Sequence, residues 1–168
     1  MGDEDNPARA LYWDAACNRA ELEKDGLAEE YLSLGGGDED TESLWRSEFI
    51  DHWAVQLSVE ELEPLRQLRN ANAHEALLPL LQMSDYGDDF AKFWFAFTLN
   101  VLSQEDSEFK QEASDRAQAL WREILIEPKG VKESHRALVK RYMLKAFEAT
   151  TAEEYVENYT RQKLSEFV

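Results

Sequence analysis

The apolar residues of this chain recur mostly every three or four positions, which is the spacing of one face of an α-helix. Trp45, Phe49 and Trp53 form one such stripe, and the stripe predicts a helix that begins near Thr41. Residues 88–104 are apolar around much of their circumference. We therefore expect this segment to form the central, buried helix.

Capping residues and helix breakers predict where other helices begin and end. The pair Asn6-Pro7 combines an N-cap residue with a proline at the first helical position, and it predicts a helix that runs to about Lys24. A capping-box pattern that begins at Thr151 predicts the last helix. Residues 65–83 also have a helical pattern, and we expect a kink at Pro79.

The whole pattern predicts an all-α fold. No segment of five or more residues alternates as a strand would, so we expect a single irregular helical bundle or array of about 6–8 amphipathic helices. The glycine triplet at 35–37, followed by three acids, is typical of a loop. We expect two parts, namely residues 1–40 as an acidic N-terminal helical segment with a Gly-rich loop and residues 41–168 as the main helical domain.

The charge of the chain is strongly negative and unevenly distributed. The 168 residues contain 35 Asp and Glu against 18 Lys and Arg, a formal net charge of −17. Residues 1–60 hold 16 acids and 4 bases, whereas residues 121–168 hold 8 acids and 9 bases. Such a field repels nucleic acid and anionic membranes and attracts basic proteins, so we expect a basic protein partner and no direct nucleic-acid binding.

Apolar and acidic residues also bear on localisation. The first residues are Met-Gly-Asp-Glu-Asp, with acids where a signal peptide has a basic and then an apolar region. No apolar run approaches the ~20 residues that a membrane span requires. The sequence therefore predicts a cytoplasmic protein without membrane association, and it leaves open whether the protein forms a homo-oligomer.

No motif in the chain names a reaction, so we expect no enzymatic activity, no cofactor and no metal site. The histidines are scattered and lack the spacing of known metal motifs, and Cys17 is the only cysteine. The one local cluster of interest for catalysis consists of Glu48, Asp51 and His52. We interpret these as structural or surface groups.

One basic group interrupts the acidic pattern. Lys129, Lys132, Arg136 and Lys140 follow one another at intervals of three or four residues, which places them on one ridge of a helix. The ridge could contact phosphate or an acidic peptide. We favour the alternative that it complements the acidic parts of the same chain or of a second copy.

These observations favour an acidic protein-binding module. The leading hypothesis is an inhibitor or immunity-type protein that neutralises a basic, nucleic-acid-acting partner by charge complementarity, in the extreme form as a nucleic-acid mimic. The alternative is a helical scaffold or chaperone-like adaptor that holds a peptide in a groove lined by the 45–53 stripe or by aromatics of residues 88–126. The predicted partner-binding residues are Asp38, Glu39, Asp40, Glu60, Glu61, Glu63, Asp85, Asp88 and Asp89.

Overall fold

The computed structural model describes residues 5–104, 108–143 and 151–167, and these residues form α-helices and a 3-10 turn without any strand. The prediction of an all-α fold is confirmed. The elements are α1 (Pro7–Asp14), α2 (Arg19–Lys24), α3 (Ala28–Ser33), α4 (Glu39–Ala54), α5 (Glu63–Asn70), the 3-10 turn η2 (His74–Ala76), α6 (Leu77–Leu81), α7 (Asp89–Leu102), α8 (Lys110–Ile126), α9 (Glu133–Met143) and α10 (Ala152–Ser165).

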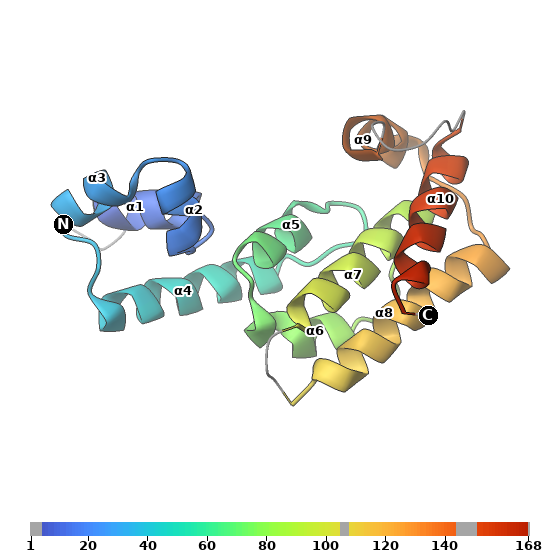
Figure 1. Cartoon of the computed structure of the whole chain (residues 1–168), viewed down its shortest axis with the longest axis horizontal. Helices are drawn as coiled ribbons and strands as arrows, with labels where there is room; N and C mark the ends of the chain where they lie inside the picture. Colours follow the sequence, from blue (N-terminus) through green and yellow to red (C-terminus); the bar gives the residue numbers. More distant parts are fainter. Residues whose placement is uncertain (1–4, 105–107, 144–150, 168) are drawn as a thin grey trace.

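The molecule is elongated, with α1–α3 at one end and α5–α10 at the other (Figure 1). Helix α4 passes beneath α1–α3 and leads toward α5, so it connects the two ends. Its apolar stripe is buried as the sequence predicts, because Trp45 and Phe49 are only 1% and 2% exposed. The two parts proposed on either side of residue 40 are therefore joined by packing between α1 and α4.

The N-terminal end is made of short helices instead of the one helix predicted for residues 7–24. The chain breaks between α1 and α2 because Ala16 and Cys17 both adopt a φ of 51°, which an α-helix cannot contain. The side chain of Asn18 then accepts a hydrogen bond from the Ala20 backbone N–H and caps α2. Two apolar residues of the break, Ala16 and Cys17, are buried.

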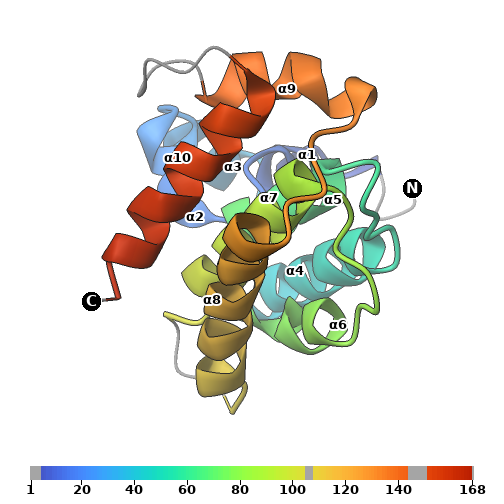
Figure 2. The same ribbon diagram turned by 90° about the vertical axis from the view of Figure 1, so that its right-hand side faces the viewer.

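Helix α7 is the centre of the larger end, as its all-round apolar pattern predicts. Ten of its 14 residues are buried, and it packs along α8. Figure 2 shows α10 running beside α8 with α9 above it. The capping box predicted at Thr151 is present, because the Thr151 hydroxyl and the Glu154 carboxylate each accept a backbone N–H of the other residue.

The segment between α5 and α7 differs from the single kinked helix predicted for residues 65–83. Helix α5 ends at Asn70, and Asn72 has a φ of 49°, so the chain turns before η2. Pro79 does not kink a long helix, because it is the third residue of the short helix α6, in a first turn whose backbone N–H groups need no helical partner.

Candidate functional site

The first predicted acidic group lies at the start of α4 and is exposed. Asp38 is the N-cap, and its carboxylate accepts hydrogen bonds from the backbone N–H of Thr41 at 2.9 Å and from the Thr41 hydroxyl. These hydrogen bonds hold the pKa of Asp38 below its ordinary value. Glu39 and Asp40 are exposed and form no ion pair with any described residue. Asp38 is thus partly structural, whereas Glu39 and Asp40 face solvent.

The second predicted group lies between α4 and α5, and two of its three members have partners. Glu60 forms an ion pair with Lys132, and Glu63 forms one with Arg66 at 2.5 Å. Glu61 is exposed and has no ion-pair partner among the described residues. All three glutamates border one pocket, so the structure brings this group together.

The third predicted group is divided. Asp85 is exposed, and its carboxylate accepts the Gly87 backbone N–H at 2.9 Å, which lowers its pKa. Asp88 and Asp89 are only 6% and 3% exposed, so the structure does not present their side chains at the surface to a partner. Asp88 caps α7, and Asp89 accepts the backbone N–H groups of Lys129 and Gly130. Their charges are satisfied by backbone donors of the loop before α9.

A buried histidine, which the sequence analysis did not single out, joins the second and third groups. His135 is 1% exposed, and its Nδ1 lies 2.9 Å from the Asp88 carboxylate. Its Nε2 lies 3.0 Å from the backbone carbonyl oxygen of Glu60. Both ring nitrogens of His135 therefore lie within hydrogen-bond distance of an oxygen acceptor. The contacts tie α9 to α7 and to the segment before α5.

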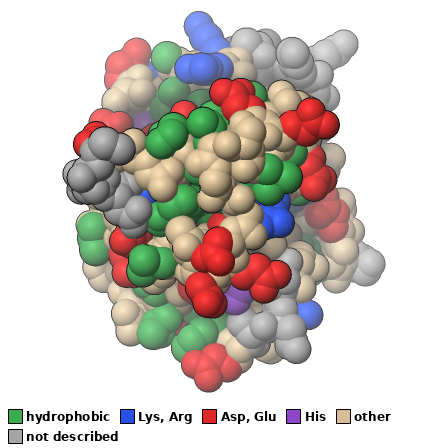
Figure 3. All heavy atoms as spheres, turned by 90° about the vertical axis from the view of Figure 1, so that its left-hand side faces the viewer, with side chains coloured by type: hydrophobic (Ala, Val, Ile, Leu, Met, Phe, Trp, Pro, Cys, Tyr) green, Lys and Arg blue, Asp and Glu red, His purple; other side chains and the backbone are tan. Residues whose placement is uncertain are grey.

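The four helices at the N-terminal end carry an acidic surface that the described residues do not neutralise. Every Lys and Arg of residues 5–60 is paired with a carboxylate, in the pairs Arg9–Glu48, Arg19–Glu42, Lys24–Glu21 and Arg46–Glu75. Among the described residues of this part, the exposed acids without an ion pair are Asp5, Asp14, Glu23, Asp25, Glu29, Glu30, Asp38, Glu39, Asp40 and Asp51. Figure 3 shows acidic side chains spread over this end of the molecule around apolar ones.

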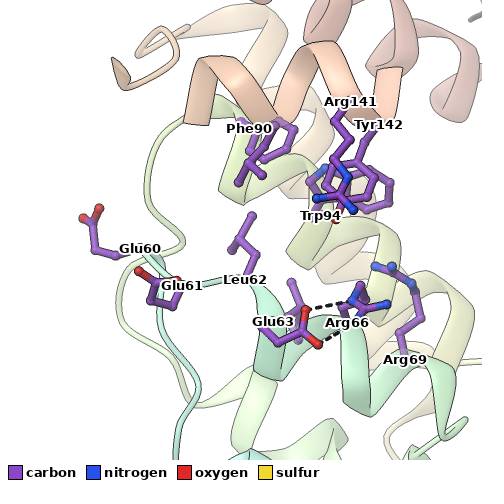
Figure 4. Close-up of a pocket in the computed structure, with 12 residues that line it drawn as sticks. Glu60, Glu61, Leu62, Glu63, Arg66, Arg69, Phe90, Trp94, Arg141 and Tyr142 are labelled. Carbon is purple, nitrogen blue, oxygen red and sulfur yellow. Dashed lines mark hydrogen bonds and ion pairs between the residues drawn. The ribbon is translucent and has the colours of Figure 1, made fainter. Parts of the chain in front are cut away.

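A pocket of about 270 Å³ lies between α5, α7 and α9, far from the start of α4. Its apolar walls include Phe90 and Trp94 from α7 and Tyr142 from α9. Figure 4 shows Glu60 and Glu61 on one side of the pocket and the arginines on the other. The pocket therefore has an acidic end and a basic end joined by an aromatic wall.

The two regions predicted to line an aromatic groove differ in burial. On α4, Trp45 and Phe49 are core residues, and Trp53 packs partly buried against the core. The aromatic residues that do line a pocket belong to the other predicted region, residues 88–126, with Phe90 and Trp94. The apolar residues on all sides of α7 include those that line the pocket. Periodicity alone could not distinguish these pocket residues from core residues.

Four of the remaining candidate residues, Glu48, His52, Lys132 and Arg136, have partners within the chain. Glu48 binds Arg9, and the Nε2 atom of His52 lies 2.9 Å from the Gln56 amide nitrogen. Within the part of the chain that the structure describes, no three His, Cys, Asp or Glu side chains are placed to hold a metal ion. Of the basic ridge, Lys132 binds Glu60 and Arg136 binds Glu153, both within the chain.

The fold and these two surfaces define an all-α protein with an acidic end and a mixed-charge pocket. No protein-family model matches the chain, and no significant similarity to a curated protein or a solved structure was found. None of the described helices is both long and apolar enough to cross a bilayer. The function must therefore be argued from the two surfaces themselves.

Proposed function

We propose that this chain is an acidic protein-binding module that captures a basic protein through the surface of α1–α4. The supporting observation is the pairing of every described base in this part, which leaves ten exposed carboxylates without an ion-pair partner among the described residues. A cluster of uncompensated carboxylates accelerates the encounter with a basic surface and fixes its orientation.

The proposed consequence is inhibition of a partner that acts on nucleic acid. Such a partner uses Lys and Arg side chains to neutralise phosphates, and these contacts supply much of its affinity. Carboxylates that occupy the same cations would compete with the nucleic acid. This role is that of an inhibitor or immunity-type protein, with the cytoplasm as the proposed place of action.

The test begins with the identity of the partner. The full chain is immobilised, exposed to native lysate at low salt and then washed at high salt, and the proteins released are identified by mass spectrometry. We expect a dominant basic protein in the high-salt wash, because exposed charge pairs are screened over about 8–10 Å at physiological ionic strength. A dominant partner that is neutral or acidic, or one retained at high salt, would contradict the proposal.

The second stage measures the association rate of the purified partner with charge-reversed variants. Glu39→Lys/Asp40→Lys reverses two exposed acids of α4, and we expect association to slow about tenfold at low salt. The matched control, Glu112→Lys/Glu127→Lys, changes the net charge by the same amount in α8 and at its C-cap. Equal slowing by both variants would show that net charge alone acts, without a defined surface.

A second candidate function is supported by the pocket. A helical adaptor could hold a peptide there, since Phe90, Trp94 and Tyr142 supply an aromatic wall. Such binding should depend weakly on salt and strongly on Trp94. A partner that survives the high-salt wash and is lost with Trp94→Ala would favour the adaptor over the inhibitor.

A further inference from the structure

Arg69 is distinctive among the cations of this chain. Seven described Lys and Arg side chains lack a carboxylate partner, and Arg69 is the one of them that is not exposed. The other six are Lys110, Arg116, Arg122, Lys129, Lys140 and Arg141. A half-buried guanidinium without a counter-ion costs free energy, because its hydration is reduced and no carboxylate replaces it.

The surroundings of Arg69 leave most of its donors available. One nitrogen lies 3.5 Å from the Thr98 hydroxyl, which is a long hydrogen bond. The guanidinium carbon lies 4.9 Å from the centre of the Trp94 ring and 5.5 Å from that of Phe97. Burial, and then the neighbouring Arg66, lower the pKa of Arg69 to about 10, so the group is still charged at neutral pH.

The nearest acid cannot serve as the missing counter-ion. Glu63 already binds Arg66 and also accepts a hydrogen bond from the Gln67 amide at 2.7 Å. Arg141 also lines the pocket, from α9, and has no carboxylate partner among the described residues. In Figure 4, Arg66, Arg69 and Arg141 lie on the same side of the pocket, with Glu60 and Glu61 across from them. At the basic end of the pocket, Arg69 and Arg141 therefore have no carboxylate partner among the described residues.

The apolar walls and the volume of the pocket indicate what kind of anion would fit beside Arg69 and Arg141. Leu62, Phe90, Trp94 and Tyr142 provide apolar walls, and a volume of about 270 Å³ lies just below the range of about 300–1,000 Å³ typical of pockets for drug-sized ligands. One ring or one branched apolar group would therefore fill it. Because the chain has a net charge of −17, a singly charged anion meets less repulsion than a dianion such as phosphate.

We propose that the pocket between α5, α7 and α9 binds a carboxylate carried on a single apolar group. The guanidinium of Arg69 forms a two-pronged contact with the carboxylate, Arg141 approaches it from α9, and the apolar group lies against Phe90 and Trp94. The carboxylate could belong to a small free acid or to the C-terminus of a peptide.

This inference is independent of the capture of a basic partner by α1–α4. It specifies the ligand chemistry for the adaptor candidate, and in that respect it rests on that proposed function. If the pocket binds free acids but no peptide, the adaptor proposal is contradicted, whereas the proposed carboxylate site is still supported.

The experiment uses the full chain and four probes in a titration followed by ¹H–¹⁵N NMR of the Trp94 indole and Arg69 Nε–H signals. The probes are 3-phenylpropionate, its neutral amide, the N-acetylated tripeptide Ala-Ala-Phe with a free C-terminus, and the same peptide amidated. We expect saturable shifts with both acids below about 10 mM and none with either amide. Tighter binding of the peptide acid would assign the site to a peptide C-terminus, and tighter binding of phenylpropionate to a small acid.

Variants separate the pocket from general charge effects. Arg69→Gln should weaken binding of 3-phenylpropionate about tenfold or more, and Arg141→Gln by a smaller factor, because the latter side chain is exposed. Arg122→Gln is the matched control, because Arg122 is exposed on α8 and donates a hydrogen bond to the Gln118 side chain of the same helix. We expect it to bind as the parent protein does. Thermal unfolding of each variant shows whether it is folded, and Arg141→Gln keeps the test valid if Arg69→Gln is not.

Three results would overturn the proposal. The first is the absence of any saturable shift with either acid. The second is equal binding of the acids and their amides, which would leave only apolar contacts. The third is equal binding by Arg69→Gln, Arg141→Gln and Arg122→Gln, which would place the anion elsewhere.

Discussion

At the scale of single residues, a buried glutamate, Glu42, joins α2 and α3 to α4. The Glu42 carboxylate is 8% exposed and accepts the Tyr31 hydroxyl at 2.5 Å and two nitrogens of Arg19. Cys17 lies in the same region, with its sulfur 3.8 Å from the Trp45 carbonyl oxygen. Burial, the largest cause, raises the pKa of the Cys17 thiol to about 12.

This pKa predicts a loss of stability in alkali. The thiol of Cys17 titrates near 9 when unfolded and near 12 when folded, so between these values the folded state holds more protons than the unfolded state. The contribution of the Cys17 thiol to the free energy of unfolding is therefore complete below about pH 9. It falls by of order 1 kcal/mol per pH unit as the pH rises to about 12.

The measurement is urea unfolding at several pH values for the parent protein and for Cys17→Ala. Alanine is a suitable replacement, because Ala16 already adopts the same positive φ as Cys17. We expect a shallower alkaline decline in the variant. Parallel pH profiles for the two proteins would contradict the assignment of this effect to Cys17.

At the scale of elements, α9 is held in place by a buried charge contact as well as by apolar packing. His135 lies against the Asp88 carboxylate at the start of α7, and both side chains are at most 5% exposed. The Lys132 backbone N–H also donates to Asp88 at 2.8 Å. Because α9 supplies Leu138, Arg141 and Tyr142 to the pocket, this contact also supports the proposed carboxylate site.

His135→Ala should destabilise the protein by about 3 kcal/mol, since removal of one partner leaves the Asp88 charge buried with fewer contacts. Chemical unfolding followed by tryptophan fluorescence gives the free energy. The control is His74→Ala, because the His74 side chain is 40% exposed beside Glu75 and should contribute less than about 0.5 kcal/mol. A similar small loss in both variants would mean that α9 is held by apolar packing alone.

At the scale of the whole molecule, the unpaired acids of α1–α4 repel one another in the folded state. Salt screens this repulsion, with a Debye length of about 30 Å at 0.01 M and about 10 Å at 0.1 M. We expect the Tm to rise by a few degrees between these two concentrations of NaCl. Glu39→Lys/Asp40→Lys should show a smaller rise, and a Tm that falls with salt would show that attractive ion pairs dominate instead.

Several features of this protein were determined by the sequence alone because they depend on local chemistry. Helical spacing predicted α4 and α7, and the Thr151 capping box predicted the start of α10. The break after α1 was missed, since nothing in the pattern of residues 7–24 indicates the positive φ at Ala16 and Cys17. The strongly acidic N-terminal third also follows from the residues themselves.

Tertiary structure alone decided which charges are free to act. Asp88 and Asp89 resemble Glu39 and Asp40 in sequence, yet the first two satisfy backbone donors in the interior and the last two face solvent. The partners of Asp88 come from residues 44 and 47 positions further along the chain. Likewise, the position of Arg69 beside Trp94, in one pocket with Arg141, requires α5, α7 and α9 to meet. Contacts between residues so far apart in the sequence depend on how the helices pack. The periodicity and composition of the sequence do not specify that packing.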